Sequence, residues 1–180
     1  MKLALFALAA CGLGLGVPAF AKAPTEACTL CGSDVMTQHN DVAPSHVMVT
    51  VSDYDRAITF YTKALGFKVG SERAAEEAFA PDLRLHDVKF REAFLVLGDM
   101  MLTVICFERP ESIPAPVPAS NRLGMQVIAF KVADIDAVAQ RVVKYGGHVD
   151  EKTRYTNQFG TTLIVTDPDG TQLELVKRTN

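Results

Sequence analysis

His46-Val-Met-Val-Thr-Val51-Ser-Asp53 leads through a helical pattern to Leu65-Gly66-Phe67, and the same order returns later in the chain. Val127-Ile-Ala-Phe-Lys-Val132-Ala-Asp134 leads in the same way to Gly146-Gly147-His148. The two stretches align without a gap, with His46 on Val127, Asp53 on Asp134 and Gly66 on Gly147. An internal repeat constrains the architecture more than any local pattern. The chain is therefore predicted to contain two related units, of which only the first begins with a histidine.

The first unit is predicted to form a strand, a helix and three more strands. Apolar side chains at 47, 49 and 51 alternate with other residues, as in a half-buried strand. Asp53 suits a helix N-cap and Gly66 a C-cap. Further strands are predicted at 67–71, 89–97 and 101–107. The Ala- and Glu-rich segment 71–85 is predicted to be a short helix or a loop over a pocket.

The second unit repeats this order after a linker, 109–124, which contains four prolines. A strand and a helix are followed by predicted strands near 148–154, 161–166 and 171–177. Asp167-Pro168-Asp169-Gly170 is typical of a hairpin turn between the last two. An α+β fold follows, with two βαβββ units, at 45–108 and 125–177, whose sheets form an open, curved barrel around a cavity. The helices lie outside it, and Phe60 and Tyr61 are expected to face the core.

The N-terminus is predicted to direct export. Lys2, an apolar run and Ala19-Phe20-Ala21 resemble a secretory signal peptide, residues 1–21, cleaved after Ala21. The apolar run is shorter than the ~20 residues that span a bilayer, which argues against a membrane anchor. Leu8-Ala9-Ala10-Cys11 resembles a lipoprotein processing box, so lipidation at Cys11 is an alternative. A periplasmic or secreted location is expected in either case.

The mature chain then begins with a polar tail, 22–44, that contains Cys28 and Cys31. In an oxidising compartment this pair favours a local disulfide, with metal binding beside His39 and redox catalysis as alternatives. Cys106 lies in an apolar run and is expected to be a buried packing thiol. The formal net charge of −3 and the absence of a Lys/Arg-rich tract argue against a nucleic-acid partner.

The repeat and its turns resemble the vicinal oxygen chelate superfamily, which includes glyoxalase I, bleomycin-resistance proteins, fosfomycin-resistance transferases and extradiol dioxygenases. The resemblance covers roughly residues 45–177. The residues that carry it are His46–Asp53, Phe60-Tyr61, Leu65-Gly66-Phe67, 127–134 and Asp167-Pro168-Asp169-Gly170 followed by Leu173-Glu174-Leu175. Because one fold hosts unrelated activities, the resemblance implies an architecture and leaves the function open.

The same resemblance identifies four positions at which glyoxalase-like members bind a metal: His46, Thr103, Val127 and Glu174. Val127 has no donor atom, and a threonine is a poor ligand for zinc, nickel or iron. The two-histidine triad of the dioxygenase-like members fails at Val127 as well. Two protein ligands seldom hold a transition metal tightly. No tight metal site is therefore expected, although a weakly bound divalent metal at His46 and Glu174 remains an alternative.

Strand alternation predicts which side chains line the cavity. With His46 inward, the mostly apolar wall has the composition of a small-molecule pocket. The remaining inward side chains are Met48, Thr50, Thr103, Ile105, Phe107, Val127, Ala129, Gln172, Glu174 and Val176. His46 and Glu174 stand out as a polar pair, an acid/base pair or the remnant of a metal site.

Two functions are compatible with this wall. The first is a binding protein for a small, largely apolar molecule, with no cofactor. The second is a glyoxalase-like lyase or isomerase, in which His46 and Glu174 transfer protons on a carbonyl or thioester substrate. The sequence does not identify the ligand. The two units can close on each other within one chain or pair across a homodimer, in which case His46 and Glu174 would come from different chains.

Overall fold

The computed structural model describes residues 43–114 and 121–179, which from Pro44 onward belong to one compact unit. The predicted signal peptide, Cys11, the Cys28/Cys31 pair and His39 lie outside these residues. The first half contains β1 (Val47–Val51), α1 (Tyr54–Lys63), β2 (Lys68–Ala80), β3 (Leu85–Leu97) and β4 (Met100–Arg109). The second half contains β5 (Ile128–Lys131), α2 (Ile135–Lys144), β6 (His148–Asn157), β7 (Gly160–Thr166) and β8 (Gln172–Arg178).

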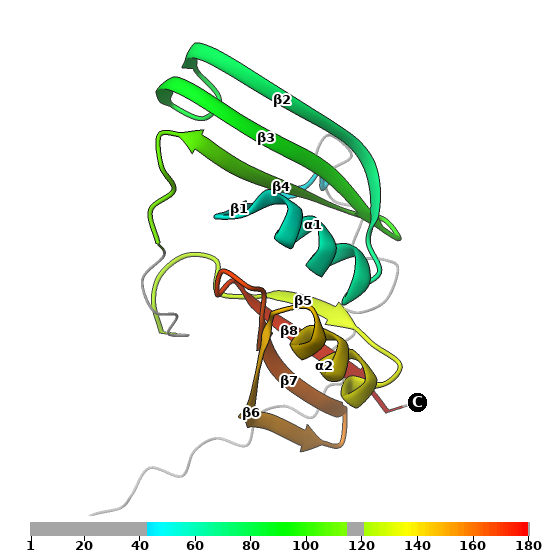
Figure 1. Cartoon of the computed structure of the whole chain (residues 1–180). Helices are drawn as coiled ribbons and strands as arrows, with labels where there is room; N and C mark the ends of the chain where they lie inside the picture. The colour runs from blue at the N-terminus through cyan, green and yellow to red at the C-terminus, as the bar shows by residue number, and fades with distance from the viewer. Residues whose placement is uncertain (1–42, 115–120, 180) are drawn as a thin grey trace, which may run out of the picture. The chain divides into compact units, whose positions relative to one another are not determined.

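Each half forms its own four-stranded mixed sheet (Figure 1). Sheet A has the strand order β1-β4-β3-β2, and sheet B has the matching order β5-β8-β7-β6. In both sheets the first strand pairs parallel with the last, and the other pairs are antiparallel. The predicted α+β fold of two βαβββ units is therefore confirmed. Within the described residues, the two sheets are separate rather than joined into one continuous barrel.

The two helices begin at equivalent caps. The Asp53 carboxylate accepts a hydrogen bond from the Arg56 amide at 3.0 Å, and the Asp134 carboxylate accepts one from the Ala137 amide at 3.0 Å. Such caps satisfy amides that have no partner inside the helix. The gapless alignment ends with the helices, because the glycine of positive φ that follows α1 is Gly66 (+85°) and the one that follows α2 is Gly146 (+90°), not Gly147. The second unit turns one residue earlier than the repeat predicts.

One hydrophobic core spans both halves and contains the buried faces of α1 and α2. Phe60 and Tyr61 are fully buried in it, as predicted. The Phe67 ring lies edge-on to Phe130, with centroids 5.9 Å apart, so the first half contacts the second directly. The Cys106 thiol is free and packs at the margin of this core, where burial raises its pKa. No helix of the described residues is long and apolar enough to span a membrane.

The segment 71–85 differs from its prediction. It is neither a helix nor a loop, because β2 continues to Ala80 and pairs with β3 down to Ala80 opposite Leu85. The turn between them includes Arg84, which has a φ of +56°. The hairpin is stabilised by a second hydrophobic cluster, in which Val88, Phe90 and Ile105 are buried. The strand was not predicted because segment 71–85 contains more helix-favouring alanines and glutamates than β-branched residues.

Candidate functional site

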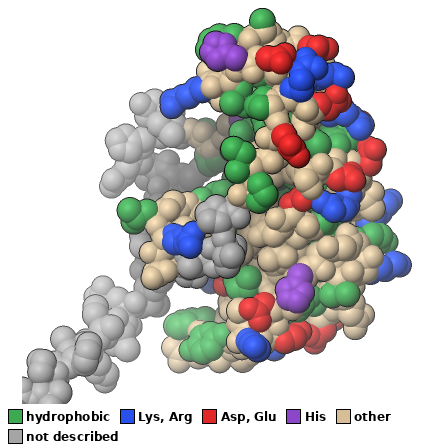
Figure 2. Space-filling view, turned by 60° about the vertical axis from the view of Figure 1, so that its left-hand side comes forward, with side chains coloured by type: hydrophobic (Ala, Val, Ile, Leu, Met, Phe, Trp, Pro, Cys, Tyr) green, Lys and Arg blue, Asp and Glu red, His purple; other side chains and the backbone are tan. Residues whose placement is uncertain are grey.

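Each sheet has one face that packs against its helix and one face that does not. In β1, Val49 and Val51 are buried in the core, whereas Met48 and Thr50 point to the other side. The parallel register places Met48 beside Thr103 and Thr50 beside Ile105. We call this side the open face of sheet A. It consists of Met48 and Thr50 from β1, Thr103, Ile105 and Phe107 from β4, Val88, Phe90, Glu92 and Phe94 from β3, and Arg73 from β2. It is mostly apolar. The side of the molecule turned forward in Figure 2 shows apolar side chains beside mixed basic and acidic ones.

His46 immediately precedes β1 and is exposed. Its Nδ1 lies 3.1 Å from Ser45 Oγ, and its ring stands edge-on to Phe94, with centroids 6.5 Å apart. Because Phe94 belongs to the open face of sheet A, His46 lies at the border of that face. An exposed imidazole next to an aromatic ring is accessible to a ligand.

Thr103 is the least satisfied polar residue of this face. Its side chain is only 2% exposed, and its Oγ1 has no hydrogen-bond partner among the described residues. A buried hydroxyl without a partner costs roughly 1–3 kcal/mol, so native proteins rarely keep one without reason. Ile105 and Phe107 share the face and also pack in the second hydrophobic cluster, at the hairpin.

The residues predicted in the second unit lie on the open side of sheet B. Ala129 pairs with Glu174, and Glu174 also pairs with Ile164 across the sheet. Gln172, Glu174 and Val176 are partly exposed there, whereas Leu173 and Leu175 point into the core. Val127 is partly buried just before β5. Both predicted sets therefore share a face within their own sheet.

The structure does not bring the two sets together within the part of the chain that it describes. Among residues 43–114 and 121–179, no hydrogen bond or ion pair joins His46 to Glu174, and no three His, Cys, Asp or Glu side chains gather as a metal site. The donor set also fits a metal poorly. Thr103 offers a neutral hydroxyl, and Val127 offers no donor. The four inherited positions therefore do not fit a tightly bound transition metal.

One charged pair on the open face of sheet A was missed by the sequence analysis. Glu92 is only 5% exposed, and its Oε1 accepts a hydrogen bond from Arg73 Nε. Strand alternation could have found Glu92, because Val88, Phe90 and Phe94 lie at the same parity. Its partner cannot be predicted from local patterns, because Arg73 lies in the segment 71–85, for which the sequence predicts a short helix or a loop.

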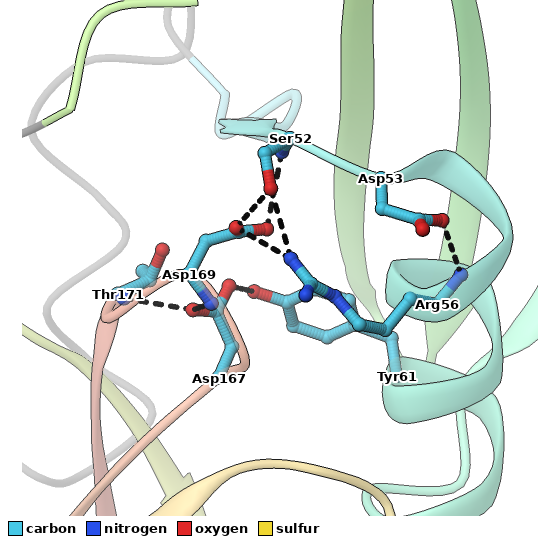
Figure 3. A network of polar contacts seen from close by, with 7 residues as sticks. All are labelled: Ser52, Asp53, Arg56, Tyr61, Asp167, Asp169 and Thr171. Atoms are coloured by element: carbon cyan, nitrogen blue, oxygen red, sulfur yellow. Dashed lines mark hydrogen bonds and ion pairs between the residues drawn. The ribbon is translucent and has the colours of Figure 1, made fainter.

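A second polar network fastens the Asp167–Gly170 turn to the first half (Figure 3). Asp169 accepts hydrogen bonds from the Ser52 amide at 3.1 Å, from Ser52 Oγ at 2.5 Å and from Arg56 Nη2 at 2.8 Å. Asp167 accepts one from the buried Tyr61 hydroxyl at 2.8 Å. Beside this network, a cavity of about 470 Å³ is lined by Met48, Thr50, Ser112, Met125 and Thr171, among others. The network positions β1, and with it the open face.

The comparisons with known proteins agree with this architecture. The model of the glyoxalase/bleomycin resistance protein/dioxygenase superfamily matches residues 43–175. The chain belongs to this superfamily. A lactoylglutathione lyase from Escherichia coli O157:H7 is 28% identical over 143 residues, which cover 73% of this chain and 90% of that protein. A putative lactoylglutathione lyase from Brassica oleracea is 27% identical over 143 residues. The matched region covers 74% of the present chain but only 43% of the Brassica protein.

Solved structures agree on the fold of this superfamily member. A glyoxalase family protein from Bacillus cereus has a TM-score of 0.67 at 22% identity, covering 81% of this chain and 99% of that one. A fosfomycin resistance protein from Listeria monocytogenes has a TM-score of 0.54 at 15% identity, covering 77% and 94%. At these identities the likeness establishes the fold alone.

Proposed function

We propose that this superfamily member binds a small, largely apolar molecule against the open face of sheet A, without a tightly held metal. The face presents Met48, which is 45% exposed, and the ring of Phe94, which stands edge-on to the exposed imidazole of His46. Ligand pockets combine such apolar walls with a few polar groups that fix orientation. This composition supports a binding surface more than a metal centre.

The observation that carries the proposal is the Thr103 hydroxyl. It lies between Met48 and Phe94 in the register of the sheet and has no partner among the described residues. A ligand with a carbonyl or hydroxyl group would satisfy it, which would offset the cost of burying it. At the same position a metal would find a weak ligand. The same residue therefore argues for a ligand and against a metal.

A second candidate function is proton transfer on a carbonyl or thioester compound by His46 and Glu174, as a lyase or isomerase. The similarity to bacterial and plant lactoylglutathione lyases favours it. The two residues lie on different sheets with no described bond between them, so this candidate needs a second chain or a rearrangement to unite them.

A neutral apolar dye, Nile red, tests the binding surface. We expect its fluorescence to rise with the purified protein and to fall in Met48→Asp, which places a charge on the open face. The matched control is Leu123→Asp, because Leu123 is fully exposed and lies outside both sheets. Equal dye binding by the two variants would locate the apolar surface elsewhere and refute the proposal.

Metal analysis of the same protein by mass spectrometry tests whether it binds without a tightly held metal. We expect nickel, zinc, iron and manganese well below one atom per chain. A stoichiometric metal that disappears in His46→Ala would overturn the metal-free proposal. The second candidate would be established instead if the protein formed lactoylglutathione from the hemithioacetal of methylglyoxal and glutathione. This activity would have to be lost both in His46→Ala and in Glu174→Gln.

A further inference from the structure

Glu92 is a buried carboxylate in apolar surroundings. Along β3 its neighbours on the open face are Phe90 and Phe94, and across the sheet it pairs with Ile105. Only 5% of the residue is exposed. A carboxylate in such a place needs charged or hydrogen-bonding partners, because burial removes its hydration.

Arg73 supplies one such partner, and it is itself held in place. Its Nε donates to Glu92, and its guanidinium lies over the Phe90 ring, 5.1 Å from the centroid. A carboxylate can accept roughly four hydrogen bonds. Among the described residues, no second donor reaches the Glu92 side chain. The carboxylate thus keeps free acceptor capacity in a fixed position.

Thr103 provides an independent observation at the same place. Thr103 pairs with Phe94, and Ile105 pairs with Glu92, so Thr103 and Glu92 are diagonal neighbours on one face. Diagonal side chains of adjacent strands lie roughly 7–8 Å apart, a span that one small molecule can bridge. The Thr103 hydroxyl is buried and has no described partner. Two under-satisfied polar groups therefore share one apolar wall.

The surrounding charges favour a cation. Glu77 lies at the same parity as Arg73 on β2, and Glu92 pairs with Arg73, so two carboxylates share this face with one guanidinium. Both carboxylates raise the pKa of Arg73. The excess negative charge would repel an anionic ligand and attract a protonated amine. The remaining acceptor capacity of Glu92 fits the N–H donors of an ammonium group.

We propose that the ligand of this face is a small apolar molecule with a protonated amine, bound by the carboxylate of Glu92 and oriented by the hydroxyl of Thr103. This inference rests on the proposed binding function and specifies its ligand class. Arg73 lies on the same face and shares the Glu92 carboxylate with the amine, so the guanidinium competes with the ammonium group for this negative charge.

Three probes of one shape and different charge test this: phenethylamine, the neutral phenethyl alcohol and the anionic hydrocinnamate. We expect calorimetry to show the tightest binding for the amine. Glu92→Gln should weaken the amine by about tenfold or more, because a hydrogen bond to a charged group is lost, and should leave the alcohol nearly unchanged. Glu76→Gln is the matched control, because Glu76 lies on the other side of β2 and pairs with Arg109.

Arg73→Gln keeps the test decisive if Glu92→Gln fails to fold. Removing the competing cation should strengthen amine binding. Tightest binding of hydrocinnamate, lost in Arg73→Gln, would overturn the inference and make Arg73 an anion site. Equal binding of all three probes would overturn it as well, while the proposed apolar surface would stand. If neither the probes nor Nile red bind, the proposed function itself fails.

Discussion

At the residue scale, the contact between Tyr61 and Asp167 shows how one side chain links the two halves. Tyr61 belongs to α1, whereas Asp167 begins the turn before β8, and both are almost fully buried. Asp167 also accepts hydrogen bonds from the Asp169 and Thr171 amides, at 3.0 and 2.8 Å, so it shapes the turn while it receives the Tyr61 hydroxyl. The pKa of Tyr61 is strongly raised, first by burial and then by the charge of Asp167.

This raised pKa predicts how stability depends on pH. Above about pH 10 the unfolded chain loses the Tyr61 proton while the folded protein keeps it, so the free energy of unfolding should fall as pH rises. Tyr61→Phe should cost about 1–3 kcal/mol near neutral pH and make the alkaline decline shallower. Urea unfolding at about pH 8 and about pH 11 measures both effects. A variant with an unchanged alkaline slope would contradict the assignment.

At the element scale, the sequence predicted the strands and helices where alternation or caps were clear. β1, α1, α2 and the last hairpin lie where Val47–Val51, Asp53, Asp134 and Asp167–Gly170 place them. The β2–β3 hairpin was not predicted, because its pairing depends on contacts between strands rather than on local preference. Glu92 and Arg73 come together only through that pairing, so the most informative charged pair could not be found from local patterns.

Gly147 shows how closely the elements approach one another. A Cβ at this position would lie 2.4 Å from the Thr166 carbonyl oxygen and 2.7 Å from the Phe60 ring. Gly147→Ala is therefore expected to destabilise the protein by about 1–3 kcal/mol through overpacking. Gly70→Ala is the matched control, since its nearest contact would be 3.1 Å and neither glycine has a positive φ. Thermal unfolding compares the stability of the two variants. Equal losses of stability would show that the close packing at Gly147 does not restrict this position more than Gly70.

At the scale of the whole molecule, the repeat predicts two units but not how their walls meet. The halves share one core through their helix-bearing faces, with Arg141 Nε donating to the Ala64 carbonyl at 3.0 Å. His46 and Glu174 lie on the other side of their sheets, away from the faces that carry the helices. A pattern within each strand fixes which face a residue occupies, but it carries no information about which sheets face each other. The divergence of the repeat at Thr103 and Val127 was visible in the sequence, and it remains the strongest argument against an inherited metal centre.

The network around Asp169 is expected to make the two halves unfold together. Three donors from the first half converge on this one carboxylate, which is only 19% exposed. Asp169→Ala removes this acceptor, leaving Arg56 with Ser52 Oγ alone, and should lower the free energy of unfolding by about 1–3 kcal/mol. Asp136→Ala is the control, because it breaks an exposed ion pair with Arg154 inside the second half and should cost about 1 kcal/mol or less. Urea unfolding followed by both circular dichroism and tyrosine fluorescence should give coincident single transitions for the unmodified protein. Separate transitions in that protein, or equal losses in the two variants, would show that the shared core couples the halves without help from Asp169.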